Sequence, residues 1–453
     1  MDMRECFWGE GRVKAGFISL GCAKNLVDTE VMLGLLQKAG IELMKNPDEA
    51  DVLIVNTCAF IETAKQESIT TVLNMAEYKT RGKCRSLILA GCLGQRYGQT
   101  LLDELPEVDA IVGTGAWRRI MEAVEATLAG SRVILAGESE IIYDAKTPRI
   151  LTTPSYTAYL KIAEGCDNRC SFCAIPMIRG RYRSRTLEDV IEEAKRLAAQ
   201  GAVELNLIAQ DTTAYGRDLY GKPALPRLLR ELVRIDGVQW IRCLYSYPRF
   251  FTDELIETIA AEPKLVKYVD LPLQHADDAL LRAMHRADTR ASMTELLKKL
   301  RERIPDVSIR STFIVGFPGE TDAQFETLRA FLEEQRFDKA GIFTYSPEEG
   351  TPAAELAGRI DENTMQERYH ALMSLQCKIS EEVNQTLEGK ELTVLVEGRE
   401  KEQENVVYGR SYREAPEVDG QVFVENCPDA QPGDMVKVRV AQGFTYDVVG
   451  EPL

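Results

Sequence analysis

Short apolar runs alternate with longer amphipathic stretches in the N-terminal third of the chain. The apolar runs lie at residues 13–20, 51–56, 86–90 and 109–113. Apolar runs of this length, separated by helical stretches, are typical of a parallel sheet with helices packed on its faces. The pattern therefore predicts a small parallel α/β domain, which we place at residues 13–143.

The alternation returns in the middle of the chain after a segment without periodicity. Residues 144–154 are rich in Thr and Pro and form the predicted linker. Beyond it, strands are predicted at 159–163, 204–209, 240–244, 268–273, 309–315 and 339–343. Six strand and helix repeats indicate an open, partial (β/α)6 barrel, which we place at residues 152–383.

A third pattern follows the barrel. Gly389 interrupts the long helical stretch at 361–388, and short alternating runs follow at 392–396, 421–424 and 435–440. Such runs predict a small antiparallel β-barrel over residues 384–453. The predicted fold class is therefore α/β with three domains, and 453 residues suit three domains of about 150 residues each.

The composition is that of a soluble globular protein. Hydrophobic residues make up 45% and charged residues 28% of the chain, and no apolar run approaches the ~18 residues that span a bilayer. The first 14 residues are charged and have no apolar core, unlike a secretory signal. We therefore expect a cytoplasmic protein. Its net charge of −16 disfavours bulk nucleic-acid binding and favours basic partners.

Eleven cysteines in a reducing compartment indicate metal ligands or reactive thiols rather than disulfides. Three of them, Cys166, Cys170 and Cys173, lie directly after the first predicted barrel strand. A structural zinc site would need a fourth ligand, usually from a second Cys or His pair, and no such pair follows. Three ligands suit a 4Fe-4S cubane whose free iron binds S-adenosylmethionine (SAM). Thiols buried by chance are the weaker alternative, because reactivity rather than packing usually accounts for clustered cysteines.

Three further cysteines each follow the end of a predicted strand in the N-terminal domain. They are Cys22, Cys58 and Cys92. The carboxyl ends of parallel strands share one edge of a sheet, so we expect these thiols to converge on a second cluster. Each alone is more often a small buried hydrophobe, but the shared position favours ligands, and Gly21 and Gly91 would let the backbone approach the cluster. We interpret the other cysteines as structural or incidental: Cys6, Cys84, Cys243, Cys377 and Cys427.

With these cysteine segments, the chain resembles the methylthiotransferase family of radical SAM enzymes over essentially its full length. The segments are Leu20-Gly21-Cys22-Ala23-Lys24-Asn25, Asn56-Thr57-Cys58, Gly91-Cys92 and the central triplet. Residues 210–216, 271–275 and 312–320, at the ends of predicted barrel strands, add to the resemblance. Residues 173–180 and 409–420 are most similar to the branch that modifies an aspartate of small-subunit ribosomal protein twelve. The family's architecture is a methylthiotransferase cluster domain, a radical SAM barrel and a TRAM barrel.

The resemblance implies a transferase that adds a methylthio group to the β-carbon of that aspartate, using two SAM molecules and two 4Fe-4S clusters. Cluster 1 would be held by Cys22, Cys58 and Cys92, and cluster 2 by Cys166, Cys170 and Cys173. Cluster 2 would cleave SAM to methionine and a 5′-deoxyadenosyl radical that takes a hydrogen from the β-carbon, and cluster 1 would present the sulfur. The resemblance implies an external electron donor and no catalytic side-chain nucleophile. SAM contacts are expected from Phe172, Gln210, Arg310 and Phe317.

The charge of the C-terminal module bears on the substrate. Residues 384–453 contain seven Lys and Arg against fourteen Asp and Glu, a net charge of −7. Phosphate contacts need Lys and Arg, whereas an acidic barrel suits a basic ribosomal protein, met free or on the ribosome. We therefore expect Glu414, Glu417 and Asp419 to lie on an exposed surface that steers this protein partner, with no strong nucleic-acid binding.

Two other functions stay open at this point. A transfer-RNA adenosine methylthiotransferase would share the chemistry and would carry a basic face on the C-terminal barrel. A non-enzymatic iron–sulfur or RNA-binding adaptor would more typically bury a cluster on four cysteines. We interpret His275 as a structural group, since a lone His at a strand end is more often satisfied than reactive. Phe172 either packs beneath the cluster or contacts adenine.

Overall fold

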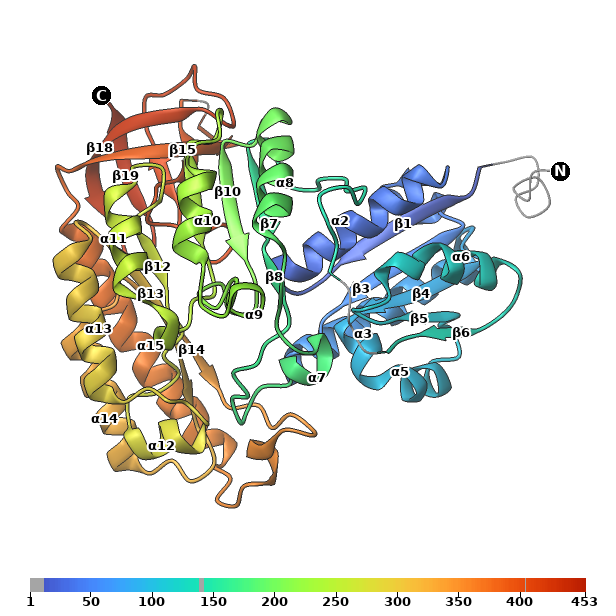
Figure 1. Ribbon diagram of the computed structural model, residues 1–453, viewed down its shortest axis with the longest axis horizontal. Helices are drawn as coiled ribbons and strands as arrows, with labels where there is room; N and C mark the ends of the chain where they lie inside the picture. The colour runs from blue at the N-terminus through green and yellow to red at the C-terminus, as the bar shows by residue number, and fades with distance from the viewer. Residues whose placement is uncertain (1–11, 138–141, 404) are drawn as a thin grey trace.

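The computed structural model describes residues 12–137, 142–403 and 405–453. In these ranges the chain forms a helix-covered sheet, a half-open barrel and a small closed barrel, in sequence order (Figure 1). The three-domain α/β prediction is confirmed. The domain bounds 13–143, 152–383 and 384–453 stay predictions, and most of the charged N-terminal segment lies outside the described residues. No helix in the described ranges is both long and apolar enough to cross a bilayer.

In the described part of the N-terminal domain, a parallel sheet forms the centre. Its strands, in spatial order, are β2 (Glu42–Met44), β1 (Lys14–Ser19), β3 (Val52–Thr57), β4 (Ser86–Gly91), β5 (Ala110–Val112) and β6 (Val133–Leu135). The helical segments are α2 (Ala23–Lys38), η1 (Pro47–Glu49), α3 (Glu62–Ala76), α4 (Tyr78–Arg81), α5 (Cys92–Glu104), η2 (Trp117–Arg119) and α6 (Ile120–Leu128). All four predicted runs form strands. The sequence pattern misses β2 and β6, because three-residue edge strands are too short to show a period.

The central domain is a half-open barrel of parallel strands, as predicted. The strands are β7 (Thr157–Lys161), β10 (Glu204–Ile208), β11 (Trp240–Cys243), β12 (Tyr268–Asp270), β13 (Ser308–Val315) and β14 (Lys339–Thr344). They form two sheets, β11-β10-β7 and β12-β13-β14, and β8 (Ala163–Glu164) pairs with β9 (Arg183–Ser184) beside them. The helical segments are α7 (Ile175–Arg179), α8 (Leu187–Ala199), α9 (Arg217–Tyr220), α10 (Leu225–Leu232), η3 (Pro248–Phe250), α11 (Asp253–Ala261), α12 (Asp278–Ala283), α13 (Arg290–Arg303), α14 (Asp322–Gln335), η4 (Pro352–Glu355) and α15 (Glu362–Gln385).

The C-terminal domain is a closed barrel, with one departure from the predicted antiparallel pairing. Its strands are β15 (Glu391–Arg399), β16 (Val407–Arg410), β17 (Val422–Val424), β18 (Met435–Gly443) and β19 (Val448–Pro452), in the order β15-β16-β17-β19-β18. β17 and β19 pair in parallel, with Val422 opposite Val448. The direction of β19 follows from its antiparallel pairing with β18, and closure then brings it against β17. The barrel lies beside the N-terminal ends of the central parallel strands (Figure 1).

The predicted linker, residues 144–154, forms no helix or strand but is held between two domains. Arg149, 2% exposed on its side chain, donates to Glu30 of α2 at 2.8 Å and to Glu193 of α8 at 2.8 Å. Pro148 lies so close to Gly34 of α2 that a Cβ there would meet the Pro148 backbone at 2.5 Å. The N-terminal domain is therefore fixed against the barrel.

Buried ion pairs join the C-terminal barrel to the central one. Glu204, the first residue of β10, pairs with Arg410 of β16 at 2.7 Å and with Arg242 of β11 at 3.3 Å, and all three side chains are buried. Burial alone would raise the pKa of Glu204, but Arg410 and Arg242 outweigh it and lower this pKa to about 2. The carboxylate is therefore charged at neutral pH and holds both arginines in place.

Two carboxylates of the acidic segment on the C-terminal barrel are buried, so the expectation that they form an exposed surface is wrong. Glu414 is 2% exposed and accepts a hydrogen bond from Lys339 at 3.1 Å. Asp419 accepts one from the Tyr268 hydroxyl at 2.7 Å. Both carboxylates bind groups of the central barrel and are therefore not available to attract a partner in solution. Glu417, between them, is exposed.

Candidate functional site

Cys22, Cys58 and Cys92 lie at neighbouring strand ends. Cys22 follows β1 and precedes α2, Cys58 follows β3, and Cys92 is the first residue of α5 directly after β4. β1, β3 and β4 are adjacent and parallel, so their carboxyl ends share one edge of the sheet. The structure therefore brings the three cysteines to one edge.

The turns before two of these cysteines depend on glycine. Gly21 and Gly91 have φ values of +85° and +90°, in the left-handed region that favours glycine. A Cβ on Gly21 would lie 3.1 Å from Cys58 Sγ, and a Cβ on Gly91 would lie 2.7 Å from the carbonyl oxygen of Thr57. The backbone at these two turns thus passes close to the neighbouring strand, and its approach to a bound cluster stays a prediction.

The thiols of this N-terminal triplet have different electrostatic surroundings. Burial raises the pKa of Cys22, but Lys24 and Arg179 outweigh it, and the pKa lies below its ordinary value. Burial raises the pKa of Cys58. Burial also raises the pKa of Cys92 to about 12 against the effect of Arg179, and the charges of Cys22 and Cys58 add to the rise. The three thiols therefore lie within electrostatic reach of one another.

The central triplet occupies the loop between β8 and α7. The Cys173 N–H donates to the Cys170 carbonyl at 3.1 Å, and the Ser171 N–H donates to the carbonyl of Met284 at 3.0 Å. Burial raises the pKa of all three thiols, and that of Cys166 reaches about 12. The charge of Cys170 raises the pKa of both other thiols, so this triplet is gathered as well.

The donor set of each triplet suits an iron–sulfur cubane. All six thiols are free of disulfides. Among the described residues, no group of three or more His, Cys, Asp or Glu side chains is arranged to hold a single metal ion. A cubane is larger, and its cysteine ligands bind different irons, so thiols that stand apart fit it better than they fit one ion. Ligand binding deprotonates thiols, so the raised pKa values of the five thiols other than Cys22 are compatible with this role. Cys6 lies outside the described residues.

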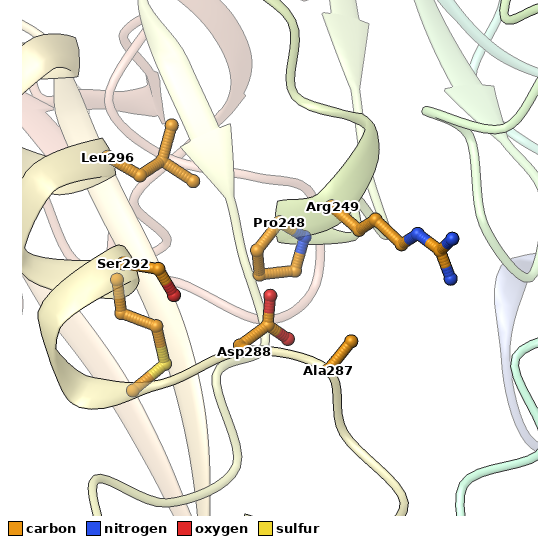
Figure 2. A pocket seen from close by; sticks show the side chains of 7 residues that line it. Pro248, Arg249, Ala287, Asp288, Ser292 and Leu296 are labelled. Atoms are coloured by element: carbon orange, nitrogen blue, oxygen red, sulfur yellow. The ribbon is translucent and has the colours of Figure 1, made fainter. Parts of the chain in front are cut away.

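A pocket of about 470 Å³ opens between η3 and the start of α13 (Figure 2). Figure 2 shows the Asp288 side chain directed toward Pro248, whereas Arg249 extends away from both. Asp288 Oδ2 lies 3.3 Å from Arg286 Nη2. Burial raises the pKa of Cys170, and Arg286 opposes that rise. Arg286 therefore connects the wall of this pocket with the central triplet.

Three of the residues predicted to contact SAM follow barrel strands or lie between the cysteines. Gln210 donates from Nε2 to Glu164 at 2.7 Å, while its buried Oε1 has no hydrogen-bond partner among the described residues. Phe317 is fully buried and packs edge-on against Tyr345, with ring centroids 5.4 Å apart. Phe172 packs beside them and stays partly exposed. The Phe317 ring thus belongs to the core, whereas Gln210 and Phe172 keep groups available to a ligand.

Arg310 lies apart from these residues. It is near the start of β13, five residues or about 16 Å before the carboxyl end of that strand at Val315. Its guanidinium lies 3.4 Å from Asp270 and 3.5 Å from Asp419. The structure therefore does not bring Arg310 together with Phe317, and its contact with SAM stays a prediction.

Sequence reasoning missed two buried cations beside the N-terminal triplet. Arg179 Nη2 lies 3.6 Å from Cys92 Sγ. Lys24 Nζ lies 3.1 Å above the ring of Tyr245, which belongs to the central domain. Both cations stand inside cysteine motifs of the sequence, but Lys and Arg are rarely buried unless paired, so only the fold reveals their place.

His275 has a structural role. The Asp277 N–H donates to its Nδ1 at 2.9 Å, so the ring proton is on Nε2, which donates to Glu320 Oε1 at 3.0 Å. Glu320 Oε2 accepts a hydrogen bond from the Gly316 N–H at 2.6 Å. His275 and Glu320 thereby stabilise the turn at residues 316–320.

Gly91→Ala is expected to remove the iron of the N-terminal triplet while the central triplet keeps its own. The new Cβ would be strained in a left-handed position and would collide with the end of β3 at the Thr57 carbonyl. Iron in the anaerobically reconstituted protein should fall by about half, measured by colorimetric assay. Gly130→Ala is the matched control. Gly130 has a φ of +85° with nothing within 4 Å of its Cβ, so this change should cost about 1–2 kcal/mol and keep all iron. Equal iron in both variants would contradict the prediction.

Three family models match consecutive parts of the chain. The model described as uncharacterized protein family UPF0004 matches residues 14–113, the radical SAM superfamily matches residues 160–332, and the TRAM domain matches residues 389–453. The first match contains the N-terminal triplet and the second contains the central triplet. The predicted order of a cluster domain, a radical SAM domain and a TRAM barrel is confirmed.

Solved structures of radical SAM enzymes share the fold. The radical S-adenosylmethionine methyltransferase TsrM from Kitasatospora setae, solved with cobalamin and a 4Fe-4S cluster, aligns with a TM-score of 0.56 at 16% identity, over 76% of this chain and 77% of that chain. The cobalamin-dependent S-adenosylmethionine radical enzyme OxsB aligns with a TM-score of 0.50 at 10% identity, over 82% of this chain and 56% of that chain. At 16% and 10% identity, the similarity is evidence for a shared fold alone.

Curated relatives match nearly the whole chain. The ribosomal protein uS12 methylthiotransferase RimO of Symbiobacterium thermophilum is 52% identical over 97% of this chain and 91% of its own length. The RimO proteins of Geobacter sulfurreducens and Desulforamulus reducens are 51% and 52% identical, over 97% and 96% of this chain and 98% of their own lengths. The chain is therefore a radical SAM enzyme that belongs to the RimO family of methylthiotransferases.

Proposed function

We propose that this protein adds a methylthio group to the β-carbon of an aspartate of ribosomal protein uS12, using SAM and two 4Fe-4S clusters. The proposal rests on one observation: a single arginine links the two three-cysteine sites. Arg179 contacts Cys92 of the first site and follows Cys173 of the second by six residues. Two neighbouring sites suit a reaction in which a radical forms at one and meets sulfur held at the other.

In this proposal the two triplets have separate tasks. Cys166, Cys170 and Cys173 hold the cluster that binds SAM, and Cys22, Cys58 and Cys92 hold the second cluster. When bound, these clusters would supply the electron that cleaves SAM and the sulfur that is transferred. The protein's own groups bind and shield the reactants, and no side chain acts as a nucleophile. Gln210 Oε1 and the Phe172 ring are the proposed SAM contacts, because both remain available. Contacts from Arg310 and Phe317 stay predictions.

A cluster of ion pairs joins the N-terminal and central domains beside Cys58. Arg96 of α5 pairs with Glu348 at 2.5 Å and donates to the Glu349 carbonyl at 2.7 Å. Lys65 of α3 lies 3.2 Å from the same Glu348 carboxylate. Arg96 also donates to the carbonyl of Ala59 at 3.1 Å. These contacts seal the N-terminal domain to the loop after β14, which supports a site that excludes water and stray C–H bonds from a carbon radical.

Charge supports a basic protein substrate. The C-terminal module has a net charge of −7, and Glu417 is exposed on it. Burial raises the pKa of Tyr159 on β7, and the Glu417 charge adds to the rise, so Glu417 lies close to the central barrel. We propose that uS12 approaches this face, that nucleic acid binds weakly, and that an external donor in the cytoplasm supplies electrons.

The direct test is mass spectrometry of purified uS12 after incubation with the reconstituted protein, a reductant and SAM. Ribosomal protein uS12 should gain one methylthio group on an aspartate, while transfer RNA treated in the same way should stay unmodified. Modification of transfer RNA alone would favour the transfer-RNA branch. Absence of 5′-deoxyadenosine would contradict the enzyme and favour the adaptor.

Glu417→Lys is expected to weaken uS12 binding about two- to fivefold at 0.1 M salt, the usual size of an exposed charge effect. The Debye length falls from ~10 Å at 0.1 M salt to ~3 Å at 1 M, so the difference should vanish at high salt. Titration calorimetry at both salt concentrations measures it. Glu425→Lys makes the same charge change at another exposed position after β17 and should have less effect. An equal effect of both substitutions would mean that net charge, and not this face, attracts the partner.

A further inference from the structure

One arginine joins the two cysteine triplets. Arg179 is the last residue of α7 and is 2% exposed. Its Nη2 lies 3.6 Å from Cys92 Sγ and 3.2 Å from Asn25 Oδ1, and both of these residues belong to the N-terminal domain. A side chain from the loop region of the central triplet therefore reaches a ligand cysteine of the other triplet.

Carboxylates fix the direction of this guanidinium. Arg179 Nη1 donates to Asp28 Oδ2 at 2.6 Å and to Glu164 Oε1 at 3.2 Å. Lys161 binds the same two carboxylates, at 2.5 Å and 2.6 Å. A guanidinium is planar and its donors have a fixed fork geometry, so holding Nη1 in this way directs an Nη2 donor toward Cys92.

The charge balance among these four side chains leaves one N–H group of Arg179 free to bind the Cys92 sulfur. Lys161 and Arg179 together balance Asp28 and Glu164, so the carboxylates do not need the remaining N–H of Arg179. Lys24 adds a further buried cation and lies close enough to affect Cys22. The surroundings of the N-terminal triplet are therefore cationic, which suits thiolates that carry a cluster.

We infer that Arg179 is a positioning residue whose hydrogen bond to the Cys92 sulfur raises the reduction potential of the N-terminal cluster and fixes that cluster relative to the central one. Reduction adds negative charge to a cluster, and a cationic donor to a ligand sulfur stabilises the reduced form. The inference rests on the proposed assignment of a cluster to Cys22, Cys58 and Cys92.

Arg149 is a control that distinguishes an effect of Arg179 on the cluster from an effect on the domain interface. Arg149 also binds two buried carboxylates that belong to different domains, Glu30 of α2 and Glu193 of α8, at 2.7 Å and 2.8 Å. Its remaining hydrogen bond in the described part of the chain goes to the Tyr159 carbonyl, not to a sulfur. Arg149→Gln should therefore loosen the same interface without changing a cluster ligand.

The experiment uses the full chain with Cys166, Cys170 and Cys173 replaced by Ala, so that the N-terminal cluster alone reports. Arg179→Gln, Arg179→Lys, Arg149→Gln and Arg149→Lys are added singly, iron is counted, and the potential is measured by redox titration with EPR detection. About four irons should remain in each variant. Arg179→Gln should shift the potential to a more negative value, Arg179→Lys should shift it less, and the Arg149 variants should match the parent.

An unchanged potential in Arg179→Gln with its iron retained would overturn the inference, and so would an equal shift in Arg149→Gln. If Arg179→Gln holds no iron, the comparison of Arg179→Lys with Arg149→Lys decides. Lys keeps the positive charge but lacks the forked donor geometry of the guanidinium. A negative shift in Arg179→Lys with none in Arg149→Lys then supports the inference, and equal potentials overturn it. Absence of iron from the starting triple variant would instead contradict the two-cluster assignment, and the inference would fall with it.

Discussion

Replacing Cys166, Cys170 and Cys173 together by Ala is expected to reduce 5′-deoxyadenosine formation from SAM to the level seen without enzyme. The three thiols are the ligands of the proposed SAM-binding cluster, and the loop that carries them supplies no substitute cysteine. Total iron should fall from about eight to about four per chain, because the N-terminal triplet is untouched. Chromatography of the SAM products and a colorimetric iron assay measure the two quantities.

The control for this variant replaces three cysteines that belong to neither triplet. Cys243, Cys377 and Cys427 are free thiols, and their joint replacement by Ala should leave both the iron content and SAM cleavage unchanged. Loss of all iron from the central-triplet variant, or of none, would contradict the assignment of one cluster to each triplet.

Replacing Cys22, Cys58 and Cys92 together by Ala should leave SAM cleavage in place and abolish methylthio transfer to uS12. The central triplet, Gln210 and Phe172 lie in the other domain, so the proposed SAM site keeps its ligands. Arg179 would lose the Cys92 sulfur but keep Asp28 and Glu164, so the interface should hold. The measurements are 5′-deoxyadenosine yield and the mass of uS12.

A conservative companion tests whether the N-terminal triplet acts through bound iron. Cys22→Ser, Cys58→Ser and Cys92→Ser keep the side-chain size but remove the sulfur ligands, and the combined variant should behave as the Ala variant does. If the Ala variant has a native circular dichroism spectrum and yet no longer cleaves SAM, the proposed division of tasks between the triplets is wrong.

The position of the N-terminal triplet was predictable because it needs only strand ends and parallel pairing. Cys22, Cys58 and Cys92 each follow an apolar run, and adjacent parallel strands end at the same edge. The short strands β2 and β6 and the parallel pair in the C-terminal barrel were not predictable, because register and closure decide them and three residues carry no period.

The buried charges could not be read from the sequence. Asp28 and Glu30, two positions apart on α2, point to different sides of the helix and are both buried, yet each has the same sequence pattern as a polar residue that faces water. Their partners, Arg179 and Arg149, are more than a hundred residues away, and only the tertiary fold pairs them. For the same reason, the net charge of the C-terminal barrel does not show which of its acidic residues face solvent: Glu414 binds Lys339 and is buried, whereas Glu417 is exposed.

The buried contact of Glu204 with Arg242 and Arg410 has a consequence for chimeric proteins. A C-terminal barrel grafted from a distant relative without the equivalent of Arg410 would leave the Glu204 carboxylate with half of its cationic partners in a dry interface. Removing one partner of a buried charge commonly costs about 3–5 kcal/mol, a large part of the stability of a typical domain. Exchange of this barrel between enzymes should therefore succeed only when the incoming barrel carries an arginine at the position of Arg410, which can pair with the Glu204 that the recipient's central domain supplies beside Arg242.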